Sequence, residues 1–391
     1  MLWGSLLFPA LVVLGHATGA LARPAAGAIP RADSPCTDPV VRKEWRALSS
    51  EQQLSYIDAV KCMQSTPGKT AELYAGVKSL YDDFQALHIS QTDNIHWVGF
   101  FLPWHRYFLW LYEQELKMAC KYTAGVPSAQ LLESRIDWTL DADTNAKFLA
   151  SPVFDTVHGF GGNGGYVRDT GSSSNRPLGP SKLTHIAMAS DDPTATGGGC
   201  LAEGPFADYQ VSMGPGNSTA PNPHCLVRDI NPGFVRQMLG RAENVQLLAQ
   251  PDFWHFTRRI EGATIGNSCH SAGHGGVGGR AGEMSNPYSS PGDPLFYLHH
   301  GVLDKLWNEW QRKGCEWLTR GGETKKDWEA RKTDMGGPDT QFAYPYNYFG
   351  TSPAYKNVTL DFEMNLGAIG GMKKISQAMD TMGGEFCYTY E

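Results

Sequence analysis

Hydrophobic residues recur at helical spacing over much of the chain, which predicts a mainly α-helical protein. Ser49-Ser50-Glu51-Gln52 has the form of a capping box and predicts a helix that runs to about Met63. A second helix is predicted over residues 70–87, where apolar side chains return every three or four positions. Pro103 suits the first turn of a third helix, which has one broad apolar face.

Two further helices are predicted in the second half of the chain. One lies near residues 255–274, and the other begins at Asp293 and Pro294 and runs to about Arg312. Residues 159–225 are rich in Gly, Ser, Pro and Asn, which predicts a long loop-rich insertion. The last part, 314–391, is irregular, with short strand-like pieces such as Val358-Thr359-Leu360. The pattern therefore favours a helical bundle with long loops and a few short strands.

The amino terminus has the pattern of a secretion signal. Leu2–Leu14 is apolar and Ala20-Leu21-Ala22 resembles a signal-peptidase site, so we expect residues 1–22 to be removed. Residues 23–35 then form a short N-terminal segment or propeptide, and 36–391 form one domain. The apolar run is too short to span a bilayer comfortably. We therefore predict a secreted, extracellular protein that has no membrane anchor.

The cysteines and two sequons agree with an extracellular location. None of the eight cysteines forms a C-x-x-C pair, so disulfides, up to four of them, are favoured over a thiolate zinc site. Cys200 and Cys225 are paired here on their proximity in the sequence alone. Asn217 and Asn357 each begin an N-x-[ST] tripeptide and are candidate glycosylation sites.

Charge excludes one class of partner. The 391 residues carry a net charge of −7 and contain no basic run, which argues against a nucleic-acid partner. We expect a monomer or a small oligomer that acts on small molecules.

Histidine is where candidate chemistry gathers. Two groups stand out, the first made of His88, His96 and His105, and the second of His270, His274, His299 and His300. Residues four apart on a helix lie on one face, so a single metal can bind both His270 and His274. Imidazole ligands alone suit copper, zinc, iron or nickel. Each histidine taken singly is also compatible with a structural role, but convergence of several predicts a metal centre.

Adjacent residues on a helix point about 100° apart, so His299 and His300 cannot easily face one metal. We favour His300 as the ligand and His299 as a packed side chain. Asp304 lies one turn after His300 and is expected to support its imidazole from behind the metal.

These residues resemble the motifs of a known family. HWVGFFLPWHRYFLWLYEQE, which begins at His96, resembles the copper-A motif of tyrosinases, catechol oxidases and hemocyanins, with His88 as its upstream ligand. His270-x3-His274, followed by SSPGDPLFYLHHGVLDKLWNEWQ (289–311), resembles the copper-B motif, whose third ligand matches His300. Tyr388-Thr389-Tyr390 resembles the tyrosine pair that closes the catalytic domain. The nearest resemblance is to short secreted fungal polyphenol oxidases.

The resemblance implies a four-helix bundle that holds a type-3 centre of two copper ions, with three histidines on each copper. It further implies O2 as co-substrate and oxidation of o-diphenols to o-quinones. Phe296 matches a family aromatic that packs on the ligand imidazoles. No cysteine lies between Cys62 and Cys120, so we expect no thioether bond to a copper-A histidine. The chain ends after Tyr390-Glu391, so we expect no C-terminal shielding domain.

Three residues bear on the choice of substrate. Relatives with strong monophenolase activity resemble one another in a Glu–Asn pair that holds a basic water. Glu261 could be that glutamate, but Ser271 stands in the position of the asparagine. Gly275, after His274, would leave the entrance open to bulky phenols. We therefore expect a strong diphenolase that has weak monophenolase activity.

Other classes of function use the same histidines. A full tyrosinase or an o-aminophenol oxidase of secondary metabolism is the main alternative. A hemocyanin-like oxygen carrier and a catalytically silent copper or zinc bundle are the others.

Overall fold

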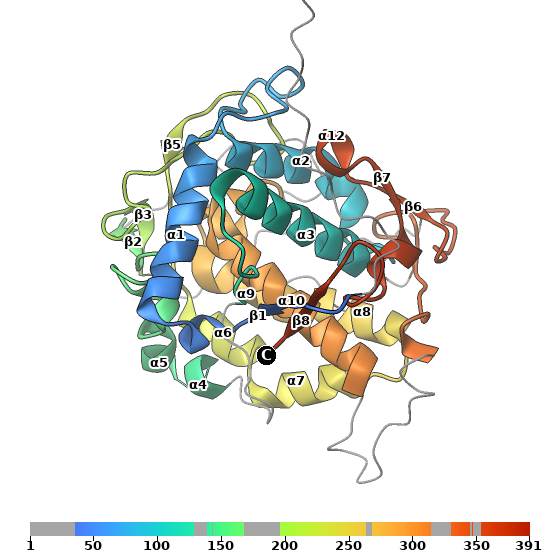
Figure 1. Cartoon of the computed structure of the whole chain (residues 1–391). Helices are drawn as coiled ribbons and strands as arrows, with labels where there is room; N and C mark the ends of the chain where they lie inside the picture. The colour runs from blue at the N-terminus through green and yellow to red at the C-terminus, as the bar shows by residue number, and fades with distance from the viewer. Residues whose placement is uncertain are drawn as a thin grey trace, which may run out of the picture.

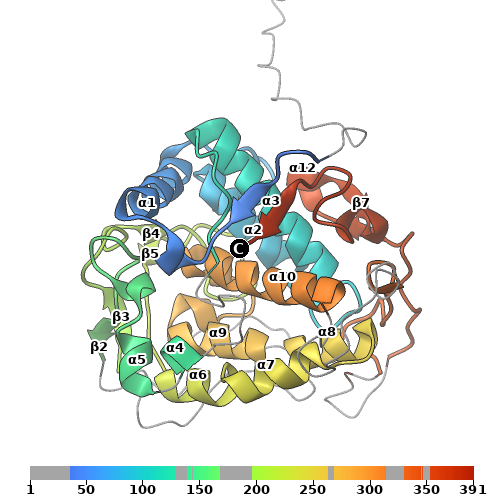
Figure 2. The same ribbon diagram turned by 60° about the horizontal axis from the view of Figure 1, so that its bottom comes forward.

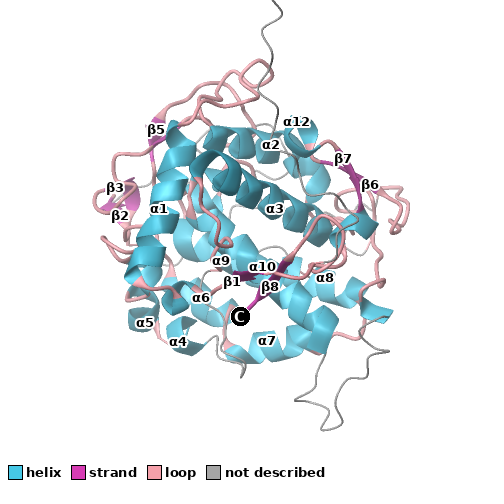
Figure 3. Cartoon of the chain, viewed as in Figure 1, coloured by secondary structure: helices cyan, strands magenta, loops and turns pink. Residues whose placement is uncertain are grey.

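A computed structural model describes residues 36–128, 139–142, 144–167, 196–262, 268–313, 330–344, 346 and 353–391. Helices make up most of it, and the strands are short (Figure 3). None of the described helices is both long and apolar enough to cross a lipid bilayer. The predicted signal at residues 1–22 and the segment 23–35 lie outside the described residues.

Four helices form the central bundle (Figure 1). They are α2 (Leu80–Ile95), α3 (Phe101–Cys120), α9 (Cys269–Gly278) and α10 (Leu295–Lys313). Helix α10 packs against both α3 and α9, and α1 (Ser50–Ser65) packs against α2 and α3. This arrangement confirms the predicted mainly α-helical fold with a four-helix bundle.

Shorter elements surround the bundle. The remaining α-helices are α4 (Thr139–Ala142), α5 (Asn145–Leu149), α6 (Pro232–Met238), α7 (Arg241–Leu248), α8 (Phe253–Glu261) and α12 (Gly367–Gly370). The 3-10 turns are η1 (Trp45–Ala47), η2 (Pro152–Phe154), η4 (Glu283–Ser285), η5 (Ser290–Gly292) and η6 (Ile375–Ala378).

The strands pair two by two. Strand β1 (Val40–Arg42) runs parallel to β8 (Tyr388–Tyr390), so the two ends of the described chain lie side by side (Figure 2). The antiparallel pairs are β2 (Gly164–Tyr166) with β3 (Gly198–Leu201), β4 (Gln210–Val211) with β5 (His224–Cys225), and β6 (Glu363–Asn365) with β7 (Met372–Lys374). A disulfide between Cys36 and Cys387 joins the same two ends covalently.

Three of the predicted helices begin at or within two residues of the expected positions. Ser49 caps α1 through its side chain, and Gln52 completes the capping box. Pro103 lies in the first turn of α3, as expected. The fifth predicted helix is α10, and the carboxylate of Asp293 accepts a hydrogen bond from the Leu295 amide at its start.

The second and fourth predicted helices have wrong boundaries. Helix α2 covers 80–95 rather than 70–87, because Ser79 and Asp82 form a capping box that fixes its start. The helix predicted near 255–274 is two helices, α8 and α9. Gly262, at φ 129°, ends α8, and the Ser268 side chain caps α9.

The predicted loop-rich insertion carries only short strands in its described parts, 159–167 and 196–225. The Cys200–Cys225 disulfide is confirmed and joins β3 to β5. A further disulfide joins Cys62 to Cys120, whereas Cys269 is a buried free thiol. Val358-Thr359-Leu360 does not form a strand; the nearby strand is β6.

A buried ion cluster ties the bundle to the two chain ends. The Asp304 carboxylate on α10 accepts hydrogen bonds from Arg106 on α3 and from Arg42 on β1, the latter at 3.1 Å. The hydroxyls of Tyr388 and Tyr390 on β8 donate to the same carboxylate. Burial raises the pKa of Asp304, but Arg106 and Arg42 outweigh it and hold that pKa below its ordinary value.

Replacement of Asp304 by Asn should destabilise the copper-free protein by about 3–5 kcal/mol, because Arg106 and Arg42 would keep buried charges without a counter-ion. The matched control is Asp361→Asn, which removes an exposed ion pair with Lys374 and should cost no more than about 1 kcal/mol. Urea unfolding measures both. The Asp304 difference should be complete above the ordinary carboxyl pKa of about 4 and shrink as the pH falls below it. Equal, small effects of the two variants would contradict this assignment.

Candidate metal centre

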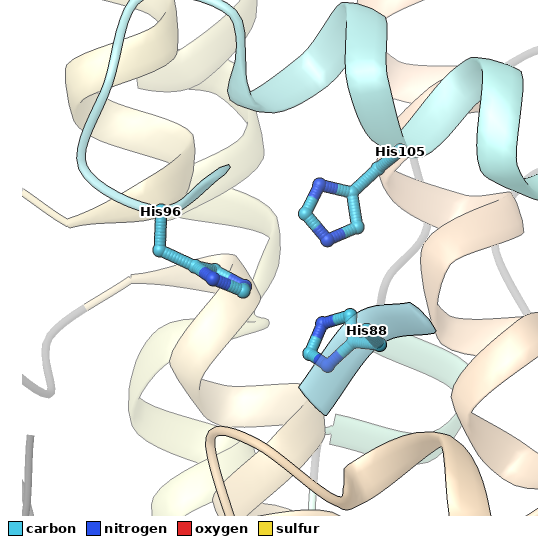
Figure 4. A group of neighbouring side chains, drawn as sticks. All are labelled: His88, His96 and His105. Carbon is cyan, nitrogen blue, oxygen red and sulfur yellow. The ribbon is translucent and has the colours of Figure 1, made fainter. Parts of the chain in front are cut away.

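The first cluster of histidines, called here the first triad, is His88, His96 and His105. His88 lies on α2, His96 is the C-cap of that helix, and His105 lies on α3. One ring nitrogen of each lies within 4.8 Å of the others. The three rings turn toward a shared space (Figure 4), and their centroids are 5.1–5.7 Å apart.

The second triad is His270, His274 and His300. His270 and His274 project from one face of α9, with ring centroids 4.7 Å apart. His300 reaches them from α10, 5.5 Å from each ring. Their ligand nitrogens also lie within 4.8 Å of one another. The helical spacing that predicted the pair on α9 is therefore realised.

The two triads are immediate neighbours. The rings of His105 and His300 stack with centroids 4.5 Å apart and planes 13° apart. His96 and His270 face each other at 5.8 Å. Two metal ions held by these triads would share one buried site.

Hydrogen bonds orient four of the imidazole rings in the same way, with Nδ1 on a backbone carbonyl. The Nδ1 atoms of four histidines lie 2.7–3.0 Å from backbone carbonyl oxygens, namely His88 at Tyr288, His96 at Thr92, His105 at Phe101 and His274 at Met284. A carbonyl can only accept, so these Nδ1 atoms carry the proton and Nε2 keeps its lone pair. The Nε2 atoms of His88, His105, His270 and His300 are buried without a partner among the described residues.

Burial also keeps the imidazoles neutral. It lowers the pKa of all six, and that of His96 and His274 falls to about 4. Neutral nitrogens with free lone pairs are what a copper or zinc ion binds. The donor set thus fits a pair of metal ions with three nitrogens each.

The structure separates His299 from His300 as the sequence predicted. The Nε2 atom of His299 lies 3.0 Å from the backbone oxygen of His270, so this ring is used to brace α9. His300 has no hydrogen-bond partner on either ring nitrogen among the described residues. Only His300 belongs to the triad.

The expectation for Asp304 is wrong. Its carboxylate oxygens bind Arg106, Arg42 and the two tyrosine hydroxyls described above, and none of these bonds reaches the His300 imidazole. The helical pattern placed Asp304 on the right face, but strongly basic partners from α3 and β1 take its oxygens.

Phe296 lies where it was expected. Its ring is 4.2 Å from that of His300 and 5.2 Å from that of His88, so it touches both triads. It is fully buried.

The residues expected to influence the choice of substrate lie on α9 or at the end of α8. Glu261 ends α8, and its carboxylate accepts a hydrogen bond from the backbone amide of Trp97, next to His96. Ser271 and Gly275 are buried on α9 beside the ligands of the second triad. Glu261 therefore lies beside the first triad and Ser271 beside the second.

Some supporting residues gave no sequence signal. Thr92 accepts from His96 through its backbone oxygen and donates its hydroxyl to the backbone oxygen of His88 at 2.6 Å. Tyr288 and Met284 act through backbone carbonyls alone. Backbone acceptors of this kind depend on the folded loop and not on a residue type.

Comparison with known proteins identifies the family. Residues 78–313, which include both triads, match the model of the common central domain of tyrosinase. The chain belongs to the tyrosinase family. The family has a type-3 dicopper centre and uses O2 with phenols, and the two triads fit that centre. The predicted family, fold and cofactor are therefore confirmed.

Fungal members of the tyrosinase family resemble the chain over most of its length. It is 33% identical to N-acetyl-6-hydroxytryptophan oxidase of Emericella nidulans over 376 residues, which cover 90% of this chain and 92% of that protein. It is 32% identical to tyrosinase P of Aspergillus terreus over 374 residues, covering 91% and 93%. A polyphenol oxidase from Thermothelomyces thermophila has a TM-score of 0.71 and 30% identity, covering 90% of this chain and 89% of that structure.

A methyl group at Gly273 should disturb the second triad. A Cβ there would lie 2.1 Å from the ring of His299, which braces α9 against α10. We expect Gly273→Ala to lower the free energy of unfolding by about 1–3 kcal/mol and to weaken copper binding at the second triad. Gly336→Ala is the control, because a Cβ there meets nothing within 4 Å. Copper content after dialysis and thermal unfolding would show the difference; full copper loading of Gly273→Ala would contradict it.

Proposed function

We propose that this protein is a copper-dependent o-diphenol oxidase that acts weakly on monophenols. The observation that carries the proposal is the pair of neutral histidine triads, which face each other across one buried space in a chain of the tyrosinase family. Two o-diphenols give two o-quinones, and O2 takes their four electrons and four protons to become two waters.

Six histidines are assigned as copper ligands in this proposal. The first triad holds one ion and the second triad holds the other. When bound, the copper pair exchanges electrons between the phenol and O2. The protein orients the ligands, because each Nδ1–H that is fixed on a carbonyl aims the opposite Nε2 at the site. Phe296 keeps the space between the triads dry.

The position of Ser271 is one reason to expect that monophenolase activity is weak. A monophenol must lose its proton before it is hydroxylated, and a water held near the copper ions would take that proton. The Ser268 hydroxyl lies 2.9 Å from the backbone oxygen of Glu261 and 3.0 Å from the Ser271 hydroxyl. Ser268 is the donor in its contact with Ser271, so the Ser271 hydroxyl accepts from it and is tied to the start of α9. A serine hydroxyl held in this way is short and holds a water near the second triad less rigidly than an asparagine amide would.

The environment of Glu261 is a second reason to expect weak monophenolase activity. Burial raises the pKa of this carboxyl well above its ordinary value, and hydrogen bonds from Trp97 and Tyr346 only partly oppose that. A carboxyl that retains its proton cannot draw a proton from a water. A protonated Glu261 and the short Ser271 side chain therefore favour catechols over monophenols as substrates.

A second candidate is oxidation of a monophenol or hydroxyindole. The Emericella nidulans relative is named for N-acetyl-6-hydroxytryptophan, whose indole ring carries one hydroxyl group. Gly275 offers no side chain that would oppose a bulky ring beside His274. Oxygen uptake with a hydroxyindole as substrate tests this candidate beside catechol and phenol.

Secretion is part of the proposal. Three disulfides among the described residues support it, because disulfides persist in oxidising compartments. Asn217 and Asn357 are both exposed, so each could carry a glycan if the chain passes through the secretory pathway.

Alanine at His300 and at His299 should have different effects on copper content. His300→Ala removes a nitrogen of the second triad, so about one copper per chain should remain, bound at the first triad. His299→Ala removes only the brace to the His270 carbonyl and should keep two coppers. Metal analysis of the purified variants measures this, and the reverse order would overturn the ligand assignment.

Oxygen uptake by the copper-loaded protein tests the substrate preference. We expect fast uptake with catechol and a long lag or little uptake with phenol, and Ser271→Asn should raise the phenol rate relative to the catechol rate. An asparagine amide is longer than serine and both donates and accepts, so it can hold a water more rigidly than Ser271 does. Ser218→Asn is the matched control, because it makes the same change on an exposed loop, and it should change neither rate.

Each other outcome has a definite meaning. Comparable rates with catechol and phenol, or a preference for the hydroxyindole, would establish the second candidate. An unchanged rate ratio in Ser271→Asn would refute the role given to Ser271. Two bound coppers without uptake on any phenol would indicate an oxygen carrier or a silent copper protein.

A further inference from the structure

A layer of tyrosines lies inside the bundle, away from the histidines. Four of them are fully buried, one on each of four helices: Tyr56 on α1, Tyr81 on α2, Tyr112 on α3 and Tyr297 on α10. The half-buried Tyr209 packs on Tyr81, with ring centroids 5.7 Å apart. Nothing in the proposed oxidation of phenols uses these residues.

Their hydroxyl groups are poorly satisfied. Apart from a contact between Tyr56 and Tyr112, the five hydroxyl oxygens are buried without a hydrogen-bond partner among the described residues. An unsatisfied buried hydroxyl costs about 1–3 kcal/mol. Phenylalanine would fill the same space at no such cost, so packing alone does not account for tyrosine here.

The tyrosine layer lies two helical turns away from the first triad. Tyr81 and His88 are seven residues apart on α2, and so are His105 and Tyr112 on α3. Seven residues are two helical turns, or about 10 Å, so each tyrosine lies on the same face as its histidine. The ring centroids of Tyr81 and Tyr112 are 6.3 Å apart, so both tyrosines lie on the same side of the first triad.

Phenylalanines fill the turn between the two layers. Phe84 and Phe108 lie between the histidine and the tyrosine of α2 and α3, and their ring centroids are 5.4 Å apart. Phe296 on α10 completes this layer, 6.1 Å from Phe108. The bundle thus stacks histidine, phenylalanine and tyrosine in three successive layers.

Aromatic rings are in contact all the way from copper ligand to tyrosine. The centroid of His88 is 5.2 Å from that of Phe296, which is 5.4 Å from Tyr297. Tyr297 is 5.6 Å from Tyr81, which touches the half-buried Tyr209. An electron can therefore move from the edge of the bundle to the metal site in short steps.

We propose that the tyrosine layer is a redox relay that reduces the oxidised metal site when no phenol is bound. The inference rests on the proposed copper centre. With hydrogen peroxide as oxidant, two tyrosines each give one electron and one hydroxyl proton and become tyrosyl radicals. The peroxide takes both electrons and two protons from solvent, and leaves as two waters. The tyrosine protons leave the layer on the side of the half-buried Tyr209, so none has to cross the phenylalanine layer, and the ligand imidazoles are spared oxidation.

Tyr297 and Tyr112 are the members to test first, because their rings stack at 3.6 Å and Tyr297 follows Phe296 directly. The copper-loaded protein is mixed with hydrogen peroxide without phenol, frozen and examined by electron paramagnetic resonance. We expect a tyrosyl radical in the wild type and loss of most of that signal in Tyr297→Phe and Tyr112→Phe. Both variants keep the ring, so catechol turnover should stay unchanged while copper is lost faster under peroxide.

Two controls decide between the relay and a bystander reaction. Tyr166→Phe makes the same change at an exposed tyrosine of β2 and should leave the radical yield unaltered. Zinc-loaded protein should give no radical. A wild type that oxidises catechol but forms no radical overturns the relay alone, whereas absence of catechol oxidation overturns the proposed function. Equal radical yields in the wild type and Tyr297→Phe, or a radical in the zinc-loaded protein, also overturn the relay.

Discussion

The ion pair between Arg106 and Asp304 is the interaction on which the centre depends. Arg106 follows His105 on α3, and Asp304 lies one turn after His300 on α10. The pair therefore links the two helices next to the point where the triads meet, and His105 stacks on His300 there. Buried charges are expensive to desolvate, and an unpaired one would be worse. Here the remaining lone pairs of the carboxylate are taken by Arg42 and two tyrosine hydroxyls, so the carboxylate itself is fully hydrogen-bonded.

This cluster also explains why the chain ends lie where they do. Arg42 and the two tyrosines belong to β1 and β8, the paired strands at opposite ends of the described chain. The guanidinium of Arg42 lies 3.5 Å above the ring of Tyr388, and the Cys36–Cys387 disulfide holds the strands together from outside. Residues remote in sequence thus complete the environment of one aspartate on α10. The metal site gains its rigidity from the closure of the whole domain.

Much of the centre could be predicted from the sequence because its signals are local. The i, i+4 histidines of α9 and the choice of His300 over His299 follow from helix periodicity alone. The failures are of two kinds. Helix α2 was misplaced because apolar residues before Ser79 continue the helical spacing, while Asp82 and Asp83 fold that segment into a loop by accepting backbone amides. Asp304 was misassigned because its partners are 198 and 262 residues away, and no local pattern reports such contacts.

One physical cause connects metal binding with the choice of substrate. A dry interior lowers the pKa of the six imidazoles and so keeps their lone pairs available for copper. The same interior raises the pKa of Glu261, because burial disfavours a carboxylate as much as an imidazolium. A hydrogen-bond donor beside Glu261 would offset this, but the Ser271 hydroxyl is tied to Ser268, from which it accepts a hydrogen bond. In the proposed function, the burial that keeps the six imidazoles ready for copper therefore also leaves Glu261 a poor acceptor for the proton of a monophenol, and an asparagine in place of Ser271 would supply the donor.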